Sequence, residues 1–338
     1  MNIAEIRQTA KERFKGTCRV CRVCDGRACA GEMPGMGGTG TGSSFIANVE
    51  ALAAIKLNLH TIHDASKPDI SFELFGHKLS MPILAAPVAG VRLNMGGTLP
   101  EADFVMAMIG GSRAADSVGM TGDGPGPVIY STGIDVIRAN GGRGIPIIKP
   151  RLVEEIGARI RQAEEADAWA VGVDVDAAGI IGMVRIGEPI GPKKVGAWRD
   201  IVAATDLPFL LKGIMTVEDA EAAVEAGAAA IVVSNHGGRV LDHTPGTADV
   251  LPEIAEAVRG DVFVLVDGGV RSGVDVLKML ALGANAVLVG RPLAIAAMGG
   301  GAEGVTTVLD QYADQLRSAM ILTGCASLDE IDESILFL

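Results

Sequence analysis

The sequence predicts an α/β fold in which eight strand–helix units close into a (β/α)8 barrel of the TIM type, and three observations support this prediction. The chain has 338 residues, and a barrel of this kind commonly reaches about 250 residues or more as one unit. Its residues are 49% hydrophobic but only 4% aromatic, and 45 are glycine, a composition that suits buried parallel strands. A short apolar run ending in Gly, Pro, Asp or Asn also recurs along the chain, each time followed by a longer segment with helical spacing.

Eight apolar runs are expected to form the barrel strands. In chain order they are Pro82–Ala86, Pro127–Ser131, Ile145–Lys149, Ala170–Asp174, Pro208–Lys212, Ala230–Ser234, Val262–Asp267 and Ala286–Gly290. The helices between them include Arg151–Ala166, with Ile156 and Ile160 on one side, and Val217–Ala226. An open doubly wound sheet is the competing topology, but it normally carries a Gly-rich fingerprint after its first strand. The sequence has Ala-Pro-Val-Ala-Gly there instead, which favours closure and places function at the C-terminal ends of the strands.

Residues 1–79 differ in character from the rest and are expected to form an N-terminal arm, with the barrel occupying residues 80–338. The arm holds four closely spaced cysteines and a Gly-rich stretch, Gly31–Gly42, that is too flexible for a helix or a strand. A second irregular region, about Gly110–Gly126, lies between the first two expected strands. Loops at a catalytic mouth are often lids, and a solvated insertion is the alternative interpretation.

Charge and segment lengths exclude several classes of partner. Lys and Arg total 29 and Asp and Glu total 41, so the formal net charge is −12, the wrong sign for a protein that follows nucleic acid or an anionic membrane surface. No apolar run approaches the roughly 20 residues of a membrane-spanning helix. The first fifteen residues mix charges and lack the apolar stretch of a secretory signal. We therefore expect a cytoplasmic location.

The sixth expected strand ends in a motif that carries chemistry. The run Ala230–Ser234 is followed by Asn-His236-Gly-Gly-Arg239. A histidine there can accept a proton at neutral pH, and an arginine three residues later can bind a carboxylate with two parallel hydrogen bonds. The alternative is that His236 only caps a turn and Arg239 forms a surface ion pair.

The last two expected strands end in glycine and arginine. The seventh is followed by Gly268, Gly269 and Arg271, and the eighth ends in Gly290 and Arg291. Backbone N–H groups freed by glycine, together with arginine side chains, make an anion site where such barrels commonly bind phosphate. Ordinary strand-to-helix turns would also contain glycine, but two Gly/Arg pairs on adjacent strands favour phosphate.

Three segments together resemble the FMN-dependent 2-hydroxy acid oxidase and dehydrogenase family, which includes glycolate oxidase and lactate oxidase. They are Ser234–Asp242, Val266–Arg271 and Leu282–Pro292. The resemblance covers roughly residues 70–338 and is densest after Pro208.

The resemblance implies a division of catalytic roles. His236 would take the proton of the substrate hydroxyl while hydride passes from the α-carbon to flavin N5, and Arg239 would hold the substrate carboxylate. Asp174 matches the aspartate that pairs with the histidine and stabilises its protonated form. Lys212 would lie beside the flavin ring, where a cation stabilises the reduced anionic form.

The resemblance also implies the contacts to FMN. Those to the ribityl chain and phosphate are Asp267, Gly268, Gly269, Arg271, Gly290 and Arg291, those through the backbone to the flavin are Ala86, Val88 and Ala89, and those to the ring are Ser131 and Ser234. The chemistry agrees, because no side chain accepts two electrons and a cofactor must do so.

Two positions depart from the family pattern on the third expected strand. Lys149 stands where the flavin-contacting glutamine is expected, and Arg151 where a substrate-contacting tyrosine is expected. The segment Val175–Gly179 also lacks the second carboxylate-binding arginine of the family. Either Arg151 replaces that arginine in binding the substrate, or the substrate is not a simple 2-hydroxy acid.

The arm cysteines are a further departure. Cys18, Cys21, Cys24 and Cys29 have the spacing C-x2-C-x2-C-x4-C, which approximates the pattern of a loop around a [4Fe-4S] cluster. Zinc bound by four thiolates is a second interpretation, although zinc sites usually take paired ligands from two separate knuckles. Free thiols in a flexible loop are the third. Cys325 matches the family's C-terminal tail and is expected to be a small buried residue.

We therefore expect an enzyme that oxidises a small L-2-hydroxy carboxylate with FMN. A homo-oligomer, tetrameric or larger, is implied by the resemblance, and a bound cluster would allow electrons to leave to a carrier protein. Two alternatives remain at this point. One is a flavin-dependent isomerase of the type 2 isopentenyl diphosphate kind, and the other is a metal-carrying electron-transfer protein with a catalytically silent pocket.

Overall fold

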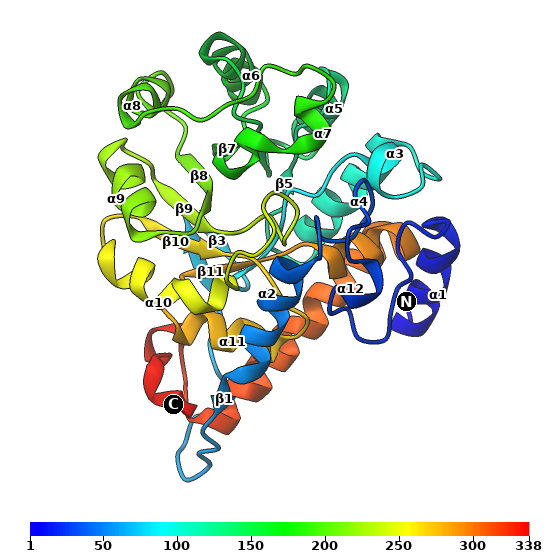
Figure 1. The fold of residues 1–338 in the computed structure, drawn as a ribbon. Helices are drawn as coiled ribbons and strands as arrows, with labels where there is room; N and C mark the ends of the chain where they lie inside the picture. The colour runs from blue at the N-terminus through cyan, green and yellow to red at the C-terminus, as the bar shows by residue number, and fades with distance from the viewer. Residues whose placement is uncertain (338) are drawn as a thin grey trace.

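The computed structural model describes residues 1–337 and contains a parallel eight-stranded sheet that closes into a barrel (Figure 1). The strands lie in the order β4, β11, β10, β9, β8, β7, β6, β5, and a parallel bridge between Ala85 and Gly119 joins the two ends. Their bounds are Ile83–Ala85 for β4, Met120–Thr121 for β5, Ile145–Ile148 for β6, Val171–Asp174 for β7, Phe209–Ile214 for β8, Ala230–Val233 for β9, Phe263–Val266 for β10 and Ala286–Val289 for β11. The predicted (β/α)8 barrel is confirmed.

Seven of the eight predicted strands coincide with these, but the second was placed wrongly. Pro127–Ser131 was expected to be a strand, whereas these residues begin helix α5, Val128–Ala139. The run is rich in β-branched residues, yet Tyr130, Ile134 and Ile137 recur at helical spacing and are buried on one face of α5. The true strand, β5, lies inside the region expected to be irregular, and helix α4, Glu101–Ala114, fills another part of that region.

Helices surround the strands and follow them in the order that a barrel requires. Besides α4 and α5 they are α3 (Val91–Asn94), α6 (Val153–Glu165), α7 (Ile181–Val184), α8 (Val195–Val202), α9 (Val217–Glu225), α10 (Thr247–Ala257), α11 (Gly273–Ala281) and α12 (Arg291–Thr323). Side-chain caps define two of the starts: Thr216 accepts a hydrogen bond from Asp219 N before α9, and Ser272 accepts one from Asp275 N before α11. Within residues 1–337 we find no helix with the length and apolar character needed to cross a membrane.

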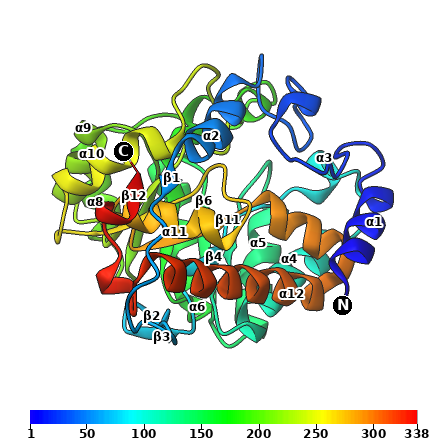
Figure 2. The ribbon, with the colours of Figure 1, turned by 90° about the horizontal axis from the view of Figure 1, so that it is seen from below.

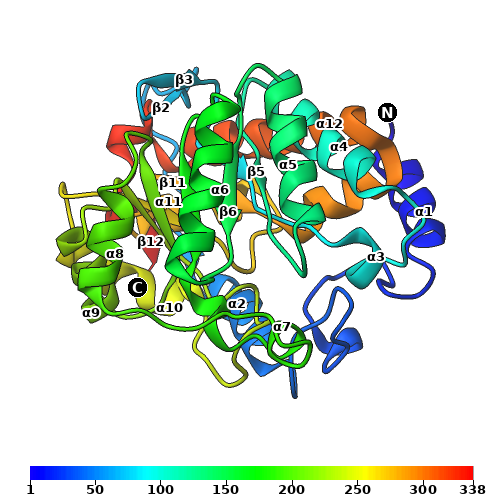
Figure 3. The ribbon, with the colours of Figure 1, turned by 90° about the horizontal axis from the view of Figure 1, so that it is seen from above.

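The barrel interior is filled by alternate residues of the strands. Leu84, Leu210, Val232, Leu265 and Leu288 belong to one buried cluster that also contains residues of a short hairpin. The hairpin consists of β2 (Phe72–Leu74) and β3 (His77–Leu79), paired antiparallel. It lies at one end of the barrel, opposite the end that carries α2 and α7 (Figures 2 and 3).

The segment before the barrel wraps around it. Helix α1 (Ile3–Arg13) packs on α12, a loop with the 3-10 turn η1 (Arg27–Cys29) follows, and α2 (Ser43–Ala54) leads to β1 (Lys56–Leu57). Strand β1 pairs antiparallel with β12 (Leu336–Phe337), so the end of the N-terminal segment is joined to the C-terminal strand. Short 3-10 turns complete the chain: η2 (Val175–Gly179), η3 (Leu328–Glu330) and η4 (Glu333–Ile335).

Candidate active site

A cavity of about 590 Å³ lies at the C-terminal ends of the strands. The arm contributes to its lining through Met33, Met36 and Thr39. Most of the residues expected in the site also line it: Ala86, Val88, Ala89, Lys149, Lys212, His236, Arg239, Asp267, Gly268, Gly269, Arg271, Gly290 and Arg291. The fold therefore brings together residues from β4 to β11 at one place.

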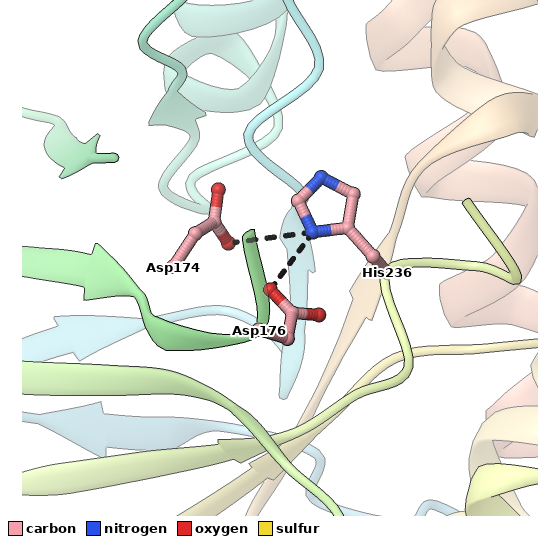
Figure 4. Close-up of side chains that lie close together, drawn as sticks. All are labelled: Asp174, Asp176 and His236. Carbon is pink, nitrogen blue, oxygen red and sulfur yellow. Dashed lines mark hydrogen bonds and ion pairs between the residues drawn. The ribbon is translucent and has the colours of Figure 1, made fainter. Parts of the chain in front are cut away.

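His236 follows β9 and takes a left-handed backbone conformation, with φ 58°. Its Nδ1 lies 3.0 Å from Oδ1 of Asp176 and 4.0 Å from Oδ1 of Asp174 (Figure 4). The expected partner, Asp174, is thus nearby, but Asp176 is the hydrogen-bonding one. Asp176 was not predicted from the sequence. The only indication of it there is a second acidic residue two positions after the end of β7. With Nδ1 directed to a carboxylate, Nε2 is the nitrogen left for another partner.

Asp174 ends β7 and is buried between two lysines. Lys149 Nζ donates to its Oδ2 at 2.8 Å, and Lys212 Nζ lies 3.2 Å from its Oδ1. Strand register explains the second contact, because Asp174 and Lys212 are direct neighbours on β7 and β8. Burial alone would raise the pKa of Asp174, but the charges of Lys149, Lys212 and His236 hold it below its usual range. Asp174 is therefore an ionised group.

Lys212 is buried and stays charged. Its Nζ donates to Ser234 Oγ at 2.9 Å and lies 3.4 Å from Oδ2 of Asp267. Burial would lower the pKa of Lys212, but the carboxylates of Asp267, Asp174 and Asp176 raise it above its usual range. Ser234 also accepts a hydrogen bond from His236 N at 3.1 Å, so it links the lysine to the histidine turn.

Three arginines converge at the cavity wall beside the arm. Arg291 donates to the carbonyls of Met36 and Gly37, and Arg239 donates to the carbonyls of Gly35 (2.5 Å) and Gly37 (3.2 Å). Burial lowers the pKa of Arg291 to about 9, and repulsion from Arg239 and Arg271 adds to the effect. Burial also lowers the pKa of Arg239 to about 10. Such a concentration of enclosed positive charge is stabilised by an anion.

A glycine cradle completes this wall after β10. Gly268 and Gly269 have φ of 104° and 78°, and a Cβ on Gly269 would lie 2.2 Å from the carbonyl oxygen of Asn48. Only glycine fits there, because helix α2 approaches so closely. Beside the cradle, Oδ1 of Asp267 is buried without a hydrogen-bond partner.

A comparison with known families decides what this site belongs to. A family model described as "FMN-dependent dehydrogenase" matches residues 35–183 and 192–338. The chain belongs to this family. It is an FMN-dependent oxidoreductase, and neither the isomerase nor the electron-transfer protein with a silent pocket is favoured.

Individual members are similar over nearly the whole chain. A "4-hydroxymandelate oxidase" of Amycolatopsis orientalis is 35% identical over 86% of this chain and 89% of its own. A "Glycolate oxidase" of Spinacia oleracea is 32% identical over 85% of each chain. A crystal structure of mandelate oxidase with (S)-2-phenylpropionate superposes with a TM-score of 0.80 at 33% identity, covering 99% of this chain and 97% of the other. The resemblance inferred from the motifs is confirmed.

The residues present fit FMN. The arginine cluster offers positive charge for a phosphate, and the cradle lets backbone N–H groups approach it. The unpartnered Oδ1 of Asp267 offers an acceptor for a hydroxyl of the ribityl chain. Cavity walls from Ala86, Val88 and Ala89 provide a surface for a flat ring.

Three expected contacts do not line the cavity: Ser131, Arg151 and the fully buried Ser234. Ser131 was expected to bond the flavin ring, but it lies on the exposed side of α5, where its hydroxyl donates to Val128 O. That expectation is wrong because the segment is a helix instead of a strand.

Arg151 was expected to contact the substrate, and the structure gives it another role. It is 2% exposed, and its guanidinium donates to both carboxylate oxygens of Asp123, to Glu188 at 2.5 Å and to Gly124 O at 2.5 Å. All three of its nitrogens are occupied, and it does not line the cavity. Arg151 is therefore part of the scaffold.

The four arm cysteines are free and half-buried. Burial raises the pKa of Cys18 to about 11, with further increases from the neighbouring thiols of Cys24, Cys29 and Cys21. Among residues 1–337, no three of these sulfurs lie within 4.8 Å of one another, and the one group that does come so close is Asp174, Asp176 and His236. A cation is not needed there, because two lysines already neutralise Asp174.

Proposed function

We propose that the enzyme oxidises a small L-2-hydroxy carboxylate, similar to lactate or glycolate, to the 2-oxo acid. The observation that carries this proposal is the orientation of His236: its Nδ1 is held by Asp176 while the side chain lines the cavity that Arg239 and Lys212 also line. Nε2 then accepts the proton of the substrate hydroxyl. Bound FMN supplies the acceptor for the two electrons and the α-hydrogen.

The acidic and basic residues have complementary roles in this proposal. Asp176 and Asp174 stabilise the imidazolium that forms on His236, because both carboxylates lie within 4.0 Å of Nδ1. Arg239 binds the substrate carboxylate from the arm side of the cavity. Lys212, with its raised pKa, remains cationic and stabilises negative charge that develops on the ring.

The remaining predicted cofactor residues are assigned by position. Arg271, Arg291, Gly290 and the Gly268–Gly269 cradle hold the phosphate, and Asp267 holds the ribityl chain. Ala86, Val88 and Ala89 line the ring, and Lys149 occupies the place of the family's glutamine beside it. Ser234 acts on the ring indirectly, since its hydroxyl accepts from Lys212.

Several further properties belong to the same proposal. We infer that residues 1–79 act as an arm that closes the cavity of the barrel formed by residues 80–338, and that the enzyme is a cytoplasmic homo-oligomer. The five cysteines, all free, fit a reducing compartment. We also infer that the four arm cysteines hold a metal centre, [4Fe-4S] or zinc, and that a carrier protein accepts the electrons. Light scattering on the purified protein tests the oligomer.

The experiment that tests the activity is anaerobic reduction of the FMN-loaded enzyme. L-lactate, glycolate and mandelate are each added without oxygen, and bleaching of the flavin absorption band is followed by stopped flow. The L-enantiomer of lactate is expected to reduce the flavin fully and to yield pyruvate, whereas D-lactate is not. If every 2-hydroxy acid leaves the flavin oxidised, the proposal is wrong.

A further inference from the structure

The loop between α1 and η1, which carries Cys18, Cys21 and Cys24, has an unusual backbone that Arg7 holds in place. Gly16, Val20 and Gly26 all have positive φ (91°, 47° and 89°), so the chain reverses direction repeatedly within a few residues. Val20 is a β-branched residue, for which this conformation is strained and must be imposed by the surroundings. Arg7 of helix α1 holds the turn by donating to Val20 O (3.1 Å) and Cys21 O (2.6 Å).

Hydrogen-bond donors are directed at the sulfurs of this loop. The backbone N–H of Val20 lies 3.4 Å from Cys18 Sγ, and Nη2 of Arg271 lies 3.6 Å from Cys24 Sγ. Arg271 also donates through Nε to Cys24 O at 3.1 Å. N–H groups that donate to cysteine sulfur are a recurring feature of iron–sulfur sites, where they set the reduction potential. The guanidinium also offsets the negative charge that ligating thiolates would bring.

The thiols are not drawn together as tightly as they would be around a single zinc ion. Four thiolates around one zinc ion, at about 2.3 Å each, lie only about 3.8 Å from one another. No three of the four sulfurs come within 4.8 Å in the part of the chain that the structure describes. In a [4Fe-4S] cluster each thiolate binds a different iron atom, and the sulfurs lie farther apart.

We propose that Cys18, Cys21, Cys24 and Cys29 bind a [4Fe-4S] cluster that carries electrons out of the flavin site. The binding site stands on the cysteine loop alone, whereas the electron path rests on the proposed function. Arg271 connects the two sites, because it lines the cavity and contacts Cys24. This path also explains why one segment, the arm, both carries the cysteines and forms part of the cavity lining.

In this redox step a one-electron carrier protein accepts the electrons that the substrate gives up. Oxidation of one 2-hydroxy acid delivers two electrons and the α-hydrogen to FMN, and His236 takes the hydroxyl proton. The two electrons then leave singly through the cluster to two carrier molecules, the flavin returns to its oxidised form, and two protons pass to solvent. No oxygen is consumed.

The test is metal and sulfide analysis of protein purified without oxygen. We expect about four iron atoms and four acid-labile sulfides per chain, and an electron paramagnetic resonance signal after reduction with dithionite. C18S and C21S are expected to lose most of the iron and the signal while keeping FMN, since neither cysteine lines the cavity. C325S is the matched control and is expected to keep both, because Cys325 is buried far along the chain at the C-terminal tail.

Each outcome decides the inference. Stoichiometric zinc, or no metal in the wild-type protein, overturns the cluster; retention of iron in C18S and C21S overturns the ligand assignment. Flavin reduction by substrate in C18S is expected at the wild-type rate, with reoxidation by ferricyanide slowed at least tenfold. Equal reoxidation rates would overturn the electron path. If substrate fails to reduce the flavin in the wild type and in every variant, the proposed function is contradicted, and the metal analysis still tests the cluster independently.

Discussion

Two networks of buried charge adjoin each other at the ends of β6 and β7, and they differ in what they leave unpaired. In one, Asp123 accepts two hydrogen bonds on each carboxylate oxygen, from Arg151, from Lys149 N and from Gly124 N. In the other, Asp174 lies between Lys149 and Lys212 near His236.

The second network has buried oxygens without partners. Oδ1 of Asp174, Oδ2 of Asp176 and Oδ1 of Asp267 make no hydrogen bond in the described structure. A buried polar atom without a partner costs free energy unless a ligand satisfies it. Of these three residues only Asp267 lines the cavity, and Oδ1 of Asp174 keeps an ion pair with Lys212 at 3.2 Å. The comparison therefore contrasts a carboxylate whose hydrogen bonds are all made within the protein with a group of carboxylates that keeps free acceptor atoms beside the cavity.

The largest effect is expected from H236A. Removing the proposed base should lower kcat/KM by roughly 100- to 10,000-fold, the usual contribution of general base catalysis. FMN content should stay at the wild-type level, because the phosphate and ribityl contacts come from other strands. S131A, on the exposed side of α5, is the matched control and should change neither quantity. If H236A lowers kcat/KM by less than tenfold, His236 is not the catalytic base.

The next effect belongs to the network around Asp123. R151M should lower the free energy of unfolding by about 3–5 kcal/mol, because it removes two of the four hydrogen bonds to the buried Asp123 and leaves only Arg159, at 3.5 Å, as a neighbouring cation. The folded fraction should keep a kcat within about threefold of wild type. Denaturant titration measures the stability, and the double variant D123N/R151M should recover part of it. If R151M has wild-type stability but binds the substrate carboxylate much more weakly, Arg151 is a substrate-binding residue after all.

A smaller effect is expected from D176N. Loss of one charge-assisted hydrogen bond, about 1.5–3 kcal/mol, corresponds to roughly a 10- to 150-fold decrease in kcat. KM should change little, since Asp176 is directed at His236 and not at the cavity lining. Stopped-flow reduction of the flavin separates the two constants. If D176N is as active as wild type, Asp174 alone orients the histidine.

The smallest effect concerns acid stability. The pKa of Asp174 lies below its usual value in the folded protein, so its contribution to stability is fully present above about pH 3.9 and is lost as the pH falls below that value. The free energy of unfolding of the wild type should therefore fall more steeply below that pH than that of D174N. Urea titrations between about pH 3 and pH 5 compare the slopes, and parallel slopes would contradict the ion-pair assignment.

Much of the site could be predicted because it lies at strand ends. The His236-Gly-Gly-Arg239 motif and the Gly268–Gly269 cradle follow apolar runs, and parallel strands in a barrel bring such positions together. The second strand was missed because the run Pro127–Ser131 is locally β-rich although its apolar residues also fit one face of a helix. Local propensity is weak evidence when burial decides the outcome.

Asp176 was not predicted, and Arg151 was wrongly predicted to bind the substrate. The reason differs from that for the second strand. Their roles depend on the 3-10 turn after β7 and on partners that are distant in sequence, such as Glu188 for Arg151. Nothing in the spacing of the residues shows whether a buried arginine is already paired.

The sequence by itself determined the number of strand–helix units, the edge of the barrel where the chemistry lies and the residue types at that edge, because strand periodicity and glycine at tight turns are local properties. Tertiary structure alone decided which carboxylate bonds His236 and how the arm covers the cavity. Those contacts join residues far apart in the chain, as between Arg271 and Cys24 or Asn235 and Asn48. Packing of the whole barrel sets them, and no local pattern encodes them.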